Sequence, residues 1–119
     1  MGSAEFIAQL KAMGFSVREE KDGLISFPYK PPLGKFVGRD LRIAYLAPGD
    51  FPLTPPPGPH ICPRLLPIQS GGIHPSGGVH DSPLGSEWQY WSRPMHHWQG
   101  TKRSARDVIA HLNRLFETQ

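Results

Sequence analysis

Cys62 is the only thiol in the chain, and it stands in the segment Pro59-His60-Ile61-Cys62-Pro63-Arg64. A cysteine forms thioesters through its thiolate, so the pKa of the thiol decides how reactive it is. His60 and Arg64 are placed to lower that pKa, and the prolines are expected to hold Cys62 on a rigid loop. A lone cysteine in a small domain also commonly fills space in the core. Two interpretations of Cys62 therefore remain, an acyl-carrying nucleophile and a buried apolar side chain.

A further reactive group is formed by His80-Asp81-Ser82. The Ser82 hydroxyl would accept an acyl group as an oxyester if a base took its proton, and His80 is the candidate base. Asp81 would help to orient or activate the acceptor. The alternative is structural, because a serine before Pro83 is a common turn residue and His80 would then belong to the same turn.

Metal binding is a third possibility, since the chain has six histidines besides its one cysteine. The spacing of His60 and Cys62 with either His74 or His80 matches no familiar ligand pattern, and acidic partners are few. The pair His96-His97 is better explained as a surface pair. We therefore predict no metal site and no cofactor.

The bulk composition of the 119 residues suits one domain, 1–119, with a modest core. Hydrophobic residues make up 38% and charged residues 19%, which argues against global disorder. The net charge is +3, but no run of Lys and Arg exceeds two residues, so nucleic-acid binding is not favoured. No segment approaches the roughly 20 apolar residues of a membrane span. A single cysteine cannot form an internal disulfide, which favours the reducing cytoplasm.

Two helices are predicted to frame these groups. The first is capped by Ser3 and ends at Gly14, where a helix prefers a residue with positive φ. Its apolar residues share one face: Phe6, Ile7, Leu10 and Met13. The second begins at a capping box formed by Ser104 and Asp107. Its apolar stripe consists of Val108, Ile109, Leu112, Leu115 and Phe116.

Short strands are predicted between the helices. Leu41–Leu46 is the clearest, because apolar Leu41, Ile43 and Tyr45 alternate with Arg42 and Ala44. Residues 15–19 and 24–27 flank an Asp-Gly turn, which is a hairpin signal, and weaker strand candidates cover 35–37 and 64–68. The order of helix, antiparallel strands, long irregular segment and helix predicts an α+β domain.

Four large aromatic side chains lie between the irregular segment and the last helix: Trp88, Tyr90, Trp91 and Trp98. They would either form a recognition surface or supply the core bulk that short strands lack. We predict that Trp88 and Trp91 belong to the core.

Several short motifs follow one another in a consistent order. The strand Leu41–Leu46 leads into Asp50-Phe51-Pro52 and then Pro56-Pro57. His74-Pro75-Ser76 and Gly77-Gly78-Val79 come next, and then Trp88. This order resembles the ubiquitin-conjugating (E2, or UBC) enzymes, with their proline corner, His-Pro-Asn motif, Gly-x-Ile/Val before the active-site cysteine, and later tryptophan. It is most similar to a bacterial branch encoded beside E1-like, JAB-peptidase and ubiquitin-like genes.

The resemblance implies a UBC-like fold with an N-terminal helix, an antiparallel four-stranded meander, a long Pro/Gly-rich active-site loop and a C-terminal helix. It also implies an E2-like component of a bacterial conjugation pathway. Such a component accepts a ubiquitin-like protein from an E1-like adenylating enzyme and transfers it to an amine of a target protein.

Two residues depart from the family pattern. His80 follows Val79 where the family has its cysteine, and Ser76 replaces the asparagine. Cys62 is therefore the first candidate acceptor, assisted by His80 and Asp81, and Ser82 is the second. The alternative is a non-catalytic E2 variant that binds the ubiquitin-like protein or the E1-like enzyme. A small metal- or nucleic-acid-binding domain is a third interpretation, and the scattered charges argue against it.

Overall fold

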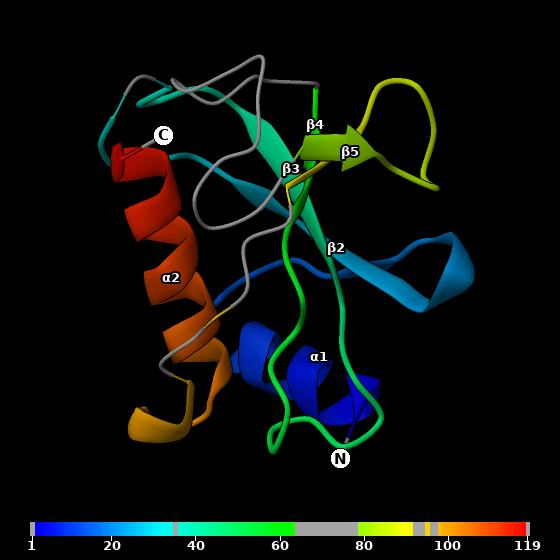
Figure 1. Ribbon diagram of the computed structural model, residues 1–119, viewed down its shortest axis with the longest axis vertical. Coiled ribbons are helices and arrows are strands. Elements are labelled where there is room, and N and C mark those ends of the chain that lie inside the picture. The colour runs from blue at the N-terminus through cyan, green and yellow to red at the C-terminus, as the bar shows by residue number, and fades with distance from the viewer. Residues whose placement is uncertain (1, 35, 64–78, 92–94, 96–97, 119) are drawn as a thin grey trace.

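The computed structural model describes residues 2–34, 36–63, 79–91, 95 and 98–118. The described chain is an α+β domain with two α-helices, α1 (Ser3–Ala12) and α2 (Ala105–Thr118), and one antiparallel sheet (Figure 1). The strands are β1 (Arg18–Glu19), β2 (Leu24–Tyr29), β3 (Leu41–Leu46), β4 (His60–Cys62), β5 (Val79–Asp81) and β6 (Gln89–Trp91). Their order across the sheet is β1-β2-β3-β4-β6-β5. Two short 3₁₀ turns cover Lys21–Gly23 and Trp98–Gly100.

The ends of α1 show one correct and one wrong prediction. Gly14 has φ of 95° and follows the helix as predicted, with its N–H bonded to Lys11 O. The N–H of Phe15 bonds to Leu10 O, so the helix ends in a Schellman motif. The expected cap by Ser3 is wrong, because Ser3 is already the first helical residue and Gly2 precedes the helix without a side-chain cap.

The strand predictions are correct where local pattern was strong. The β1–β2 hairpin forms around Lys21–Gly23, although β1 covers only two residues. β3 has the predicted bounds, with its apolar alternation intact. The weak strand at 35–37 is wrong for its described part, since Phe36 and Val37 lie in a turn. The strand candidate 64–68, His74-Pro75-Ser76 and Gly77-Gly78 lie outside the described residues.

Both helices pack on the same face of the sheet, which we call the helix face. The predicted stripe of α2 is buried along its whole length, as predicted. Phe116 of α2 meets Tyr29, Phe36 and Trp91 with ring centroids 5.3–6.2 Å apart. The core on this face includes Phe6, Leu10, Ile25, Phe27, Ile43, Tyr45, Ile61, Trp91, Val108 and Leu112. Burial of these large apolar side chains is the main stabilising contribution to the fold.

The start of α2 lies close to α1, as Figure 1 shows near the lower end of the red-to-orange helix. Ser104 and Asp107 interact as predicted, with the Ser104 N–H and Oγ both 2.9–3.0 Å from Asp107 Oδ2. The serine hydroxyl donates to the carboxylate and does not accept from the Asp107 N–H. Only one half of the capping box is therefore formed, the bond from the Ser104 N–H to the side chain of Asp107 in the first turn.

The proline corner is anchored to the core. Phe51 is fully buried between Phe6 and Trp98, with ring centroids 5.1 and 6.1 Å away. The Trp98 indole N–H donates to Pro52 O at 2.9 Å.

Trp88 and Trp91 are both buried, which confirms the predicted core placement.

Neither helix among the described residues has the length and apolar character needed to cross a membrane.

Candidate functional site on the second face of the sheet

Strand alternation sends His60 and Cys62 to the face of the sheet opposite the helices, which we call the second face. Between them, Ile61 points into the core and is fully buried. In the strand register Arg42 of β3 lies opposite Cys62, while Tyr90 of β6 lies opposite His60. The second face therefore brings the candidate thiol together with side chains from three strands.

Cys62 is half-buried and packs against a small apolar cluster. The cluster consists of Leu24, Ala44 and Trp88, and both Cys62 and Leu84 pack against it. Burial raises the pKa of the Cys62 thiol, and the Glu87 carboxylate raises it further. The charges of Arg18 and Arg42 lower the pKa but do not reverse the shift.

The expected activation of Cys62 is therefore wrong for the described residues. The thiol sits in a strand, not on a rigid loop, and its pKa rises where a lowered one was expected. Burial lowers the pKa of His60 to about 4, so its ring is neutral near pH 7 and offers no positive charge to a thiolate. Arg64, the other expected activator, lies outside the described residues.

His60 makes a different contact from the one expected. Its Nδ1 lies 2.8 Å from Ser82 Oγ, although 22 residues separate them in the sequence. The Tyr90 ring lies against the imidazole with centroids 4.7 Å apart. His60 is 8% exposed, so the ring is held between its neighbours with little access for water.

Ser82 begins a turn, as the structural interpretation predicted. The Leu84 N–H donates to Ser82 Oγ at 3.1 Å, and the Gly85 N–H donates to Ser82 O at 3.3 Å. The same hydroxyl also meets His60, so it combines a turn role with contact to a potential base.

His80 and Asp81 lie in β5, where the backbone of His80 pairs with Tyr90 and that of Asp81 with Gln89. The turn interpretation of His80 is therefore wrong. The roles proposed for these two residues beside Cys62 or Ser82 stay predictions.

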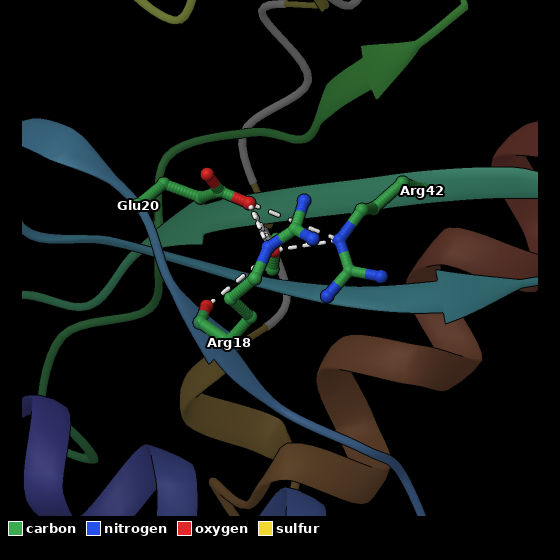
Figure 2. Close-up of polar contacts among 4 residues, drawn as sticks. Arg18, Glu20 and Arg42 are labelled. Atoms are coloured by element: carbon green, nitrogen blue, oxygen red, sulfur yellow. Dashed lines mark hydrogen bonds and ion pairs between the residues drawn. The ribbon is translucent and has the colours of Figure 1, made fainter.

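A polar network occupies the β1–β2–β3 end of the second face (Figure 2). Arg18 Nε donates to Glu20 Oε2 at 2.9 Å, and Ser26 Oγ donates to the same oxygen at 2.7 Å. Arg42 Nε donates to Ser26 Oγ at 2.9 Å and lies 3.8 Å from Glu20 Oε2. Arg18 thus bonds to the carboxylate directly, and Arg42 is linked to it through the buried Ser26.

Opposing effects set the pKa of Glu20. Partial burial raises the pKa of the carboxyl. The hydrogen bonds from Ser26 and Arg18 and the charges of Arg18 and Arg42 outweigh that effect, so the net pKa lies below the usual value. Glu20 is therefore ionised across the physiological range.

Two contacts of the site were missed from the sequence. The His60–Ser82 contact depends on β6 pairing with β4, and no periodicity predicted that pairing. The Arg42–Ser26–Glu20 network had a partial signal, because the predicted hairpin and the alternation of β3 place Ser26 and Arg42 on one face.

No three His, Cys, Asp or Glu side chains gather closely enough to hold a metal ion within the part of the chain that the structure describes.

Compared with known proteins, the chain matches no family model, no curated protein and no solved structure.

Proposed function

We propose that this chain is an E2-like component of a bacterial ubiquitin-like conjugation pathway that carries no thioester on Cys62. Its role is to engage a ubiquitin-like protein and the E1-like adenylating enzyme that activates it. The ordered motifs support this proposal, from the proline corner to Trp88. So does an α+β domain that begins and ends with a helix and pairs β1 to β4 in chain order.

The main observation in support of the proposal is the burial of Cys62 and the raised pKa of its thiol. A thioester carrier needs an accessible thiolate of moderate pKa. Cys62 is instead half-buried against the cluster of Leu24, Ala44 and Trp88, and the pKa of its thiol is raised. His80 stands where the family has its cysteine. These features favour the binding form over the alternative, in which Cys62 accepts the modifier and passes it to an amine.

The test is an interaction and charging assay. The purified chain is mixed with ATP and with an E1-like enzyme and a ubiquitin-like protein of the bacterial branch that it resembles, and E1 charging serves as the positive control. We expect a complex with one of the two proteins and no thiol-labile adduct on this chain. Failure to bind either protein overturns the proposal, whereas a thiol-labile adduct absent from Cys62→Ala establishes the carrier form.

A surface variant sharpens the binding measurement. In E2-like proteins the first helix commonly meets the E1, and Lys11 is an exposed cation of α1. Lys11→Glu is expected to weaken binding of the E1-like enzyme. Lys102→Glu, an equal charge change at another exposed site, serves as the matched control and should bind normally.

A further inference from the structure

The contact between Ser82 and His60 has the geometry of a nucleophile beside its base. We propose that Ser82 is an acyl acceptor and that His60 takes its hydroxyl proton. The oxygen and the ring nitrogen Nδ1 are 2.8 Å apart, a distance suited to direct proton transfer. The sequence placed His80 in this role, and the tertiary structure brings His60 to the hydroxyl.

The backbone of the turn favours one direction for the hydroxyl proton. The Leu84 N–H donates to Ser82 Oγ at 3.1 Å, so it occupies one lone pair of the oxygen. The hydroxyl is then free to donate its own hydrogen to His60 Nδ1. A Ser82 oxygen that donates to a base is primed for attack on a carbonyl carbon.

The position of His60 is held from several sides. Its backbone pairs with Ala44 of β3 and with Tyr90 of β6, and the Tyr90 ring covers the imidazole. Because His60 sits on a paired strand, its ring has little freedom to move away from Ser82. Catalytic groups are positioned more precisely on helices and strands than on loops, and His60 lies on a strand.

The burial of His60 sets the expected reactivity. A ring that stays neutral near pH 7 keeps its lone pair available for the serine proton. The same burial makes it a weak base, so acylation should be slow. The rate should remain constant from neutral pH to mildly acidic pH and decline only as the pH approaches the His60 pKa of about 4.

The step conserves atoms and electrons. Ser82 Oγ attacks the acyl carbon of an activated ester or thioester, and its proton passes to His60 Nδ1. The bond from the acyl carbon to the leaving oxygen or sulfur breaks, and the leaving group takes the proton from His60. The product is an oxyester on Ser82 and a free alcohol or thiol, with no oxidation or reduction.

The physiological acyl donor rests on the proposed function, since it would be the modifier's C-terminal glycine held as a thioester by the E1-like enzyme. The reactivity of Ser82 itself does not depend on that partner. It is tested with p-nitrophenyl acetate, which releases p-nitrophenolate when it acylates a nucleophile.

In the full chain we expect acetylation at Ser82, located by peptide mass mapping, resistant to thiols and removed by hydroxide. Ser82→Ala should abolish it. His60→Asn keeps a polar partner for Ser82 but removes the base, so acetylation at Ser82 should slow about 100-fold. Ser86→Ala, in the next turn along the chain, should react like the wild type. Circular dichroism confirms that each variant is folded.

Either of two results overturns the inference: no acetylation at Ser82 in the folded wild type, or an unchanged rate in His60→Asn. Ser82 acetylation without binding of either pathway protein leaves the inference standing and removes the proposed function. Binding of a pathway protein without Ser82 acetylation overturns the inference and leaves the proposed function standing.

Discussion

The side-chain carbonyl of Gln9 in α1 accepts a hydrogen bond at 2.6 Å from the backbone N–H of Ala105, the first residue of α2. The first N–H groups of a helix have no partner within the helix, so Gln9 acts as a cap supplied from 96 residues away. One contact thereby joins the two helices that cover the core.

Gln9→Ala is expected to destabilise the domain by about 1 kcal/mol, the usual cost of losing a helix cap. Gln9→Glu keeps an acceptor oxygen and adds negative charge at a helix N-terminus, so it should be as stable as the wild type. Urea unfolding of the three proteins measures the difference. Equal stability of Gln9→Ala and the wild type would show that the contact contributes nothing.

Gly34 is expected to tolerate no side chain. It has φ of 95°, and an added Cβ would overlap the backbone carbonyl of Phe116 in α2. Gly34→Ala should therefore cost more than about 2 kcal/mol, combining left-handed strain with the displacement of a helix end. Gly38 is the matched control, because its φ is 77° but an added Cβ meets nothing within 4 Å. Gly38→Ala should cost only about 1 kcal/mol, and similar thermal midpoints for the two variants would contradict the collision with Phe116.

Two tyrosines should respond oppositely to loss of their hydroxyl. Tyr45 is fully buried, and its hydroxyl has no hydrogen-bond partner among the described residues. Tyr45→Phe should be neutral or stabilising, because it removes an unpaired polar atom from the core. Tyr29 donates from its hydroxyl to Asn113 Oδ1, so Tyr29→Phe should cost about 1 kcal/mol. Urea unfolding is the measurement, and a destabilised Tyr45→Phe protein would mean that the hydroxyl is satisfied.

His60 should make the stability of the domain depend on pH. Its pKa is about 4 in the folded state and near 6.5 when unfolded, so the unfolded chain binds more protons between these values. Its contribution is therefore complete above pH 6.5 and is lost as the pH falls toward 4. The difference between pH 7 and pH 4.5 is about 2 kcal/mol.

The His60 effect is isolated by comparison with His60→Asn, which does not titrate in this range. Unfolding free energies of both proteins are measured from pH 7 to pH 4.5, so that changes caused by carboxylates cancel. The wild type should lose more stability than the variant, and parallel curves would refute the burial effect on His60.

Cys62 should react slowly with alkylating agents. Its raised pKa leaves less thiolate at pH 7.5 than a free cysteine has, and half-burial limits access. Iodoacetamide labelling followed by mass spectrometry should be slower in the folded protein than in urea. Glu87→Gln removes a charge that raises the pKa and should accelerate labelling, whereas Glu19→Gln, which lies on the other face of the hairpin, should not. Labelling of the folded protein as fast as in urea would contradict the raised pKa.

Much of the local structure was predictable because it depends on residues that are adjacent in the sequence. The alternation of Leu41–Leu46 predicts a strand with one apolar face, and the spacing in α2 predicts its buried stripe. Gly14 ends α1 because a residue without Cβ adopts positive φ at low cost. Each of these features needs only the backbone preferences and side-chain period of a few adjacent residues.

The predicted lowering of the Cys62 pKa was wrong for a reason that lies outside its segment. From the sequence, only His60 and Arg64 stood near enough to influence the thiol. In the fold the charges of Glu87 and Arg42, which come from other elements, also act on the Cys62 thiol. Cys62 also packs against the cluster of Leu24, Ala44 and Trp88. The pKa of a side chain depends on burial and on charges in space, so sequence neighbours alone predicted the wrong direction.

The sequence by itself determined an α+β domain, the end of α1 at Gly14, the start of α2 at Ser104, the hairpin and the two faces of the clearest strand. The tertiary structure alone decided which chemistry-bearing side chains meet. Pairing of β4 with β6 places His60 against Ser82, and packing of the two helices brings Gln9 to Ala105. Local periodicity fixes which way a side chain faces, but register between distant strands is chosen by the burial of the whole core.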